Sequence, residues 1–91
     1  MDRRARIEAL LRASFAPVAL DVLDESAQHR GHAGAAGGAG HFRVRLVSER
    51  FRGVARLTRH RMVYEALSAE IGREIHALAL ELASPDEAAI K

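Results

Sequence analysis

The chain has 91 residues, enough for one compact domain with a modest core, and we interpret residues 1–91 as a single domain. Apolar residues make up 48% and charged residues 29%, a composition that excludes a disordered chain. The 14 basic and 12 acidic residues leave a formal net charge of only +2, which by itself is weak evidence for a nucleic-acid partner.

The chain contains no cysteine, which excludes a disulfide, a thiolate nucleophile and a metal site built from its own thiolates. Any metal must be held by histidine, by carboxylate or by ligands borrowed from a partner. No Ser-His-Asp spacing with supporting context and no phosphate-cradling motif is present, so we expect neither an enzyme nor a small-molecule substrate. No apolar run approaches the roughly 20 residues of a membrane span, and we expect a cytoplasmic protein with no membrane partner.

The first predicted element is an amphipathic helix over Arg3–Phe15, which Pro17 stops. Two strands follow, over Leu20–Asp24 and Phe42–Val47, and we expect them to form a hairpin. The segment between them, His29 to Gly40, is rich in glycine and alanine. It predicts a long loop that is mobile in the free protein.

The second half of the chain predicts a helix over Thr58–Ile71, capped by Thr58 and ended by Gly72 in a left-handed turn. Strict alternation predicts a third strand over Ile75–Leu82, and Ser84-Pro85-Asp86-Glu87 is typical of a helix start. The helices at Arg3–Phe15 and Thr58–Ile71 are expected to bury one apolar stripe each against the sheet. The core candidates are Ile7, Leu10, Leu11, Val63, Leu67 and Ile71.

Charge is unevenly distributed along the chain. Between His41 and Arg61 there are seven arginines and Glu49 is the only acid, whereas the segment from Glu65 to Glu87 carries most of the later acids. This pattern predicts a protein with one basic and one acidic side.

A set of short motifs at fixed spacing makes the chain resemble the BolA family, over Arg3 to about Pro85. The pairing of Arg59-His60-Arg61 with Ile75-His76-Ala77-Leu78 is the most specific part. The other matching segments are Asp24-Glu25-Ser26, His29, His41-Phe42-Arg43-Val44, Val47-Ser48, Phe51-Arg52-Gly53, Leu57 and Met62-Val63-Tyr64.

The resemblance implies an α+β fold like a class II KH domain, with a three-stranded sheet, helices on one face and the order α-β-β-α-β-α. This order agrees with the elements predicted above. RNA-binding KH domains clamp the RNA backbone with a Gly-x-x-Gly loop, whereas the comparable turn here, Phe51-Arg52-Gly53-Val54, has a single glycine. We therefore do not expect RNA clamping of the KH kind.

The resemblance also implies a partner, a monothiol glutaredoxin, and a bridging [2Fe-2S] cluster held only in complex with glutaredoxin and glutathione. The partner cysteine and the glutathione thiolate would hold one iron, and imidazoles of this chain would hold the other. The candidates implied are His76, at the start of the third strand, and either His29 or His32 in the loop. Taken without the family, a strand or loop histidine is more often structural or solvated, and we assign His41 and His60 to that group.

The arginines carry a second hypothesis, because some BolA-like proteins are described as DNA-binding, stress-responsive transcriptional regulators. Such arginine runs are equally typical of a solvated face. In the alternative, functional interpretation the arginines contact DNA phosphates or another anion. The candidates are Arg52, Arg56, Arg59 and Arg61.

Overall fold

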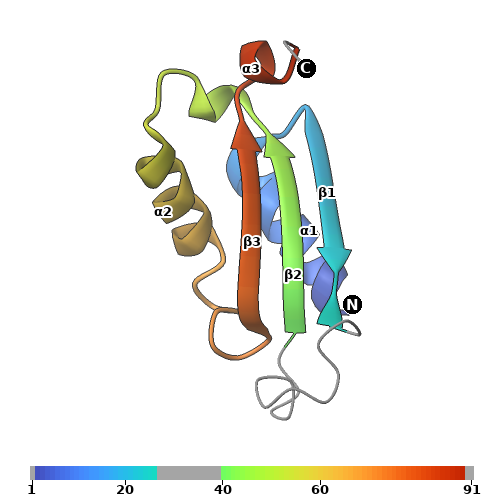
Figure 1. Ribbon diagram of the computed structural model, residues 1–91. Coiled ribbons are helices and arrows are strands. Elements are labelled where there is room, and N and C mark those ends of the chain that lie inside the picture. Colours follow the sequence, from blue (N-terminus) through green and yellow to red (C-terminus); the bar gives the residue numbers. More distant parts are fainter. Residues whose placement is uncertain (1, 27–39, 90–91) are drawn as a thin grey trace.

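The structure is a computed structural model that describes residues 2–26 and 40–89. Two helices pack with a three-stranded sheet, which confirms the predicted α+β class and the predicted element order (Figure 1). The elements are α1 (Arg3–Phe15), β1 (Ala19–Asp24), β2 (Gly40–Val47), the short 3-10 helix η3 (Glu49–Phe51), α2 (Arg56–Ala66), β3 (Ile75–Ala83) and α3 (Pro85–Ala89).

The sheet has the order β1-β2-β3 and mixes two kinds of pairing. β1 and β2 are antiparallel neighbours, as the hairpin prediction requires, whereas β2 and β3 are parallel. A parallel pair needs a crossover connection, and α2 supplies it. Figure 1 shows α1 behind the sheet and α2 alongside β3, so the face of the sheet turned toward the viewer is an open face.

Strand alternation directs one set of side chains into the core beneath α1. Phe42, Val44 and Leu46 of β2 are buried, while Arg43 and Arg45 between them lie on the open face. Phe15 at the end of α1 and Phe51 of η3 close the core, with ring centroids 5.2 Å apart. Four of the six predicted core residues, Ile7, Leu11, Val63 and Leu67, are buried, and Leu10 and Ile71 pack against them partly buried.

Helix α1 has the predicted bounds because its ends are well defined. The Asp2 carboxylate accepts a hydrogen bond from the Ala5 N–H at 2.7 Å, and Ala16 takes a left-handed conformation with φ of 43° before Pro17. Within residues 2–26 and 40–89, no helix is long and apolar enough to cross a membrane.

Helix α2 differs from the prediction at both ends. It begins at Arg56, with Ala55 as an N-cap that makes no side-chain hydrogen bond, so Thr58 does not cap it. The left-handed Gly53, with φ of 73°, turns the chain, and the Arg59 side chain then bonds back to the Val54 carbonyl at 2.8 Å. The helix ends at Ala66, and hydrogen-bonded turns follow as far as Glu74. Gly72 is left-handed, with φ of 83°, but within these turns and not at the helix end.

Strand β2 starts two residues before its predicted boundary. The Gly40 N–H donates to the Glu74 carbonyl at 2.8 Å, which joins Gly40 and His41 to the sheet. A Cβ on Gly40 would lie 2.5 Å from Cε2 of Phe42, so only glycine fits at this close approach. The rest of the segment that we predicted to be mobile, with His29 and His32, lies outside the described residues.

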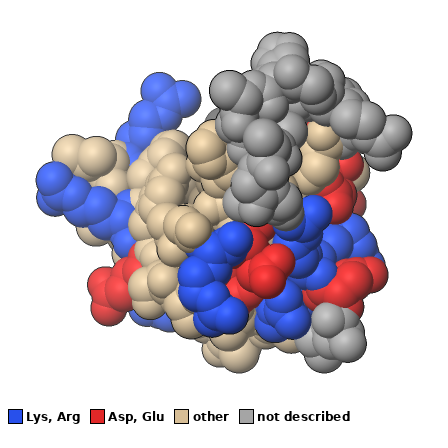
Figure 2. Space-filling view, turned by 90° about the horizontal axis from the view of Figure 1, so that it is seen from below, with Lys and Arg blue, Asp and Glu red and all other residues tan. Residues whose placement is uncertain are grey.

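Acidic and basic side chains do not separate onto two sides, so that prediction is wrong. Ion pairs join the arginine-rich segment to the later acids: Arg43 lies 3.8 Å from Glu81, and Arg52 lies 3.2 Å from Asp86. Figure 2, which views the end of the sheet where β2 and β3 begin, likewise shows blue and red groups side by side. Strand pairing brings together residues that are far apart in sequence, and sequence blocks therefore do not predict surface patches.

Candidate functional site

The predicted ligand His76 lies at the start of β3, where its exposed ring is next to His41 of β2. The two ring centroids are 5.2 Å apart, with an angle of 57° between the ring planes. We call these two residues the His41–His76 pair. Sequence reasoning assigned His41 a structural role, and the structure places it beside the predicted ligand.

A β-bulge explains how two neighbouring strands bring these rings together. The register passes from Gly40 opposite Ile75 to His41 opposite Ala77, so His76 is the extra residue of the bulge. Bulges change the direction of a side chain relative to regular alternation. No alternation pattern in the sequence indicates this irregularity, which is why the sequence did not predict that His41 lies beside His76.

The segment that contains His29 and His32 leaves and rejoins the described structure beside the same pair. The Ser26 hydroxyl accepts a hydrogen bond from the His41 N–H at 3.0 Å, and the Glu25 N–H donates to the His41 carbonyl at 2.7 Å. His29 is three residues beyond Ser26, a reach of at most about 11 Å along the chain. The structure does not describe His29 or His32, and their assignment stays a prediction.

Ser26 is itself fixed by a turn at the end of β1. The Asp24 carboxylate accepts a hydrogen bond from the Ser26 N–H at 2.9 Å, and hydrogen bonding to Ser26 holds the pKa of Asp24 below its usual value. Asp24, Ser26 and Gly40 thus fix the backbone around His41. The pair combines the exposed imidazole of His76 with the half-buried imidazole of His41, whose Nε2 is buried. Within the described ranges no cluster of three or more His, Asp or Glu residues is placed to hold a metal ion.

Arg59 is at the opposite end of the sheet, and its guanidinium is hydrogen-bonded to other groups of the protein. Only 8% of the residue is exposed. Its two terminal nitrogens donate to the Glu87 carboxylate at 2.6 and 3.0 Å, and Nε donates to the Val54 carbonyl at 2.8 Å. The guanidinium also lies over the Phe51 ring, 5.7 Å from its centroid. We call Arg59 with Val54 and Glu87 the arginine clasp.

The clasp also shifts the titration of its acid. The hydrogen bonds from Arg59, and after them the one from the Ser84 N–H, lower the pKa of Glu87 to about 2. Ser84 and Glu87 are the first and fourth residues of the predicted helix-start motif. The 2.9 Å bond from the Ser84 N–H to Glu87 is the half of a capping box that this motif predicts. The sequence thus located Glu87 at a helix start but not its pairing with Arg59.

The other three candidate arginines are all exposed, but only one of them forms ion pairs with described acidic residues. Arg52 makes two hydrogen bonds of 2.8 Å to Glu49 and lies 3.2 Å from Asp86. Arg56 and Arg61 are exposed on α2, and no ion pair to another described residue is found for either. Of the four candidates, these two are therefore available to an external anion.

Comparison with known proteins agrees with this description. The model of the family described as BolA-like protein matches residues 11–87, so the chain belongs to the BolA-like protein family. It is 52% identical over 77 residues to the Escherichia coli protein named DNA-binding transcriptional regulator BolA, covering 85% of this chain and 70% of that protein.

Solved structures of the family share the fold. The BolA domain of SufE1 from Arabidopsis thaliana superposes with a TM-score of 0.84 at 37% identity, covering 96% of each chain. The BolA1 protein from Mus musculus superposes with a TM-score of 0.78 at 42% identity, covering 96% of this chain and 68% of that one. The predicted family is therefore confirmed, and with it the three-stranded α+β fold.

Proposed function

We propose that this protein is a non-enzymatic, cytoplasmic partner of a monothiol glutaredoxin and shares a bridging [2Fe-2S] cluster with it, in iron-sulfur cluster trafficking or iron sensing. The observation that carries the proposal is the His41–His76 pair, which places two imidazoles at the end of the sheet where the segment with His29 and His32 is attached. The resemblance to the BolA family supplies the partner and the cluster.

The donor chemistry of this chain fits half of such a cluster. Each iron of a [2Fe-2S] cluster needs two terminal ligands besides the bridging sulfides, and two imidazoles can replace two thiolates on one iron. A chain without cysteine can supply only these, and the thiolates would come from glutaredoxin and glutathione. His76 is the first candidate ligand, and the second is His29, His32 or, on the geometry, His41.

The test is reconstitution with a monothiol glutaredoxin, glutathione, iron and sulfide, followed by size and by visible absorbance. We expect a coloured one-to-one complex, and at least about a tenfold shorter cluster lifetime for His76→Ala. His29→Ala, His32→Ala and His41→Ala then identify the second ligand as the variant with the larger loss. His60→Ala, on α2, is the matched control and should behave as the parent. An unchanged spectrum and lifetime in His76→Ala would contradict the assignment.

Acidification should release the cluster, because neutral imidazole binds iron and imidazolium does not. We expect the lifetime of the complex to fall steadily from pH 7 to pH 5. The measurement is the decay of visible absorbance for the parent and for His76→Cys, in which a thiolate would replace the imidazole. A parent complex whose lifetime is independent of pH in this range would count against imidazole ligation.

DNA binding is a second candidate function, favoured by the name of the Escherichia coli relative and by the exposed Arg56 and Arg61. Arginine contacts to phosphate are salt-dependent and read little sequence. Arg56→Ala with Arg61→Ala should weaken binding uniformly across sequences and reduce the salt slope by about 2, one per lost contact. Arg73→Ala, in the turn before β3, is the control. Undiminished binding by the double variant at low salt would exclude this patch.

A further inference from the structure

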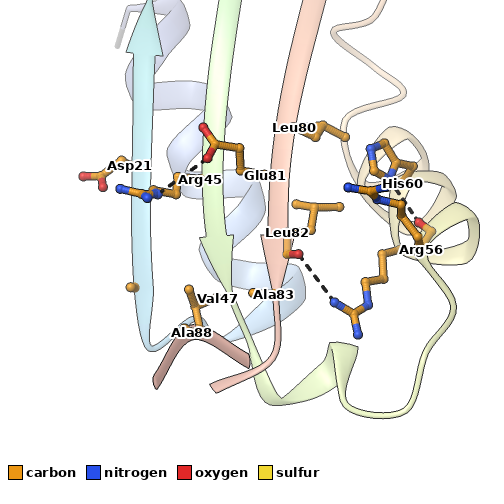
Figure 3. A pocket seen from close by; sticks show the side chains of 12 residues that line it. Asp21, Arg45, Val47, Arg56, His60, Leu80, Glu81, Leu82, Ala83 and Ala88 are labelled. Carbon is orange, nitrogen blue, oxygen red and sulfur yellow. Dashed lines mark hydrogen bonds and ion pairs between the residues drawn. The ribbon is translucent and has the colours of Figure 1, made fainter. Parts of the chain in front are cut away.

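A hollow of about 530 Å³ lies between β3 and α2 and extends around the edge strand β3 onto the open face of the sheet (Figure 3). Leu80 and Leu82 of β3 form its apolar floor on the side next to α2. The charged or titratable residues that line it are Asp21, Arg45, Arg56, Arg59, His60 and Glu81. Its volume is within the range of small-molecule sites, and its lining combines apolar and charged side chains.

The hollow is separate from the His41–His76 pair. Leu80, the residue of the hollow that is nearest to His76 along β3, lies four positions beyond it, about 13 Å along an extended strand. The inference therefore goes beyond the proposed function, and neither depends on the other.

Nearly all of the charges around the hollow have an opposite charge close by. Arg59 is bound to Glu87, as described above. Arg45 lies 4.0 Å from Glu81 and is paired in register with Asp21 of β1. Asp21 and Arg56 are the exceptions, because neither forms an ion pair with another described residue, and they lie at opposite sides of the hollow, on β1 and on α2 (Figure 3). The charges around the hollow balance as a whole, but the Arg56 guanidinium at its α2 side has no counter-ion among the described residues.

His60 stands next to this guanidinium. Its Nδ1 lies 3.0 Å from the Arg56 carbonyl, which can only accept, so Nδ1 carries the proton; Nε2 accepts a hydrogen bond in the neutral ring and donates one only in the imidazolium. Figure 3 shows Arg56 and His60 side by side, with Leu80 and Leu82 next to them. A cationic group, a second polar group and an apolar floor thus converge at one place.

We propose that this hollow binds a small amphipathic organic anion, with its carboxylate or sulfonate on Arg56 beside His60 and its apolar body over Leu80 and Leu82. An anion fits because Arg56 is the one arginine of the lining that forms no ion pair with a described residue, and guanidinium forms strong, often bidentate bonds with such groups. An apolar body fits because a fully hydrophilic anion would leave the leucine floor exposed to water.

The experiment is a titration of the full chain, labelled with ¹⁵N, with 2-naphthoate as the probe. We expect saturable shifts of backbone amides at Arg56–His60 and Leu80–Ala83, with a dissociation constant below about 1 mM. The matched neutral probe 2-naphthamide has the same ring system without the charge. It should bind at least about tenfold more weakly.

Two variants on the same helix separate this site from a general basic surface. Arg56→Gln should weaken 2-naphthoate binding at least about tenfold, whereas Arg61→Gln, outside the hollow, should leave it unchanged. Both positions are exposed, and the amide spectrum itself shows that each variant is folded. The proposal is overturned if shifts are not saturable up to about 10 mM, if they centre on His41 and His76, or if the two variants or the two probes bind equally.

Discussion

The two ends of the three-stranded sheet use polar side chains in opposite ways. At the Arg59 end, a nearly buried guanidinium bonds to a carboxylate, to backbone carbonyls and to an aromatic face. At the other end, His76 is exposed on a bulge beside His41. An arrangement with its buried polar groups satisfied stabilises a fold, whereas the exposed imidazole of His76 contributes little to folding and is available to a ligand. The comparison separates a structural end from a candidate functional end.

The largest expected effect comes from removing the guanidinium of the arginine clasp. Arg59→Ala should lower the free energy of unfolding by about 3 kcal/mol, since it leaves the Val54 carbonyl without its donor, unpairs Glu87 and opens a gap beneath Phe51. Urea denaturation measures the loss. Arg61→Ala, exposed on the same helix, should change stability by less than about 0.5 kcal/mol. Equal stability of the two variants would show that the clasp does not hold α3 in place.

A smaller effect should appear on acidification, through Glu87. Its pKa is lowered from 4.5 to about 2 in the folded protein, so its contribution is fully present above pH 4.5 and is lost as the pH falls from 4.5 toward 2. Glu87→Gln removes this ionisation but keeps a side-chain oxygen acceptor. The stability difference between parent and variant should therefore shrink across this window, and a difference that stays constant would contradict the ion pair.

The smallest effect on stability should come from the candidate functional end. His76→Ala should change the free energy of unfolding by less than about 0.5 kcal/mol, because the side chain is exposed and the described structure assigns it no hydrogen bond. Thermal and urea unfolding of the free protein measure this. A loss above about 1 kcal/mol would make His76 part of the fold, and cluster loss in the same variant would then no longer identify a ligand.

Sequence reasoning was most successful where local patterns act alone. The amphipathic stripe and Asp2 defined α1, and strict alternation defined β2 and β3 to within a few residues. It failed at α2, where the start depends on the reach of Arg59 back to Val54 and not on a local cap. It also did not predict that His41 lies beside His76, because a one-residue bulge changes side-chain direction without changing the hydrophobic pattern.

The sequence by itself determined the elements, the absence of cysteine, the family and the identity of His76 as the main candidate ligand. These depend on periodicity, composition and motifs, which are properties of the chain read in order. Only the tertiary structure decided that Arg59 forms an ion pair with Glu87, 28 residues away, and that His41 lies beside His76. Both contacts join different elements through the parallel strand pairing and the helix packing. The charge and hydropathy of neighbouring residues in the sequence do not predict such contacts.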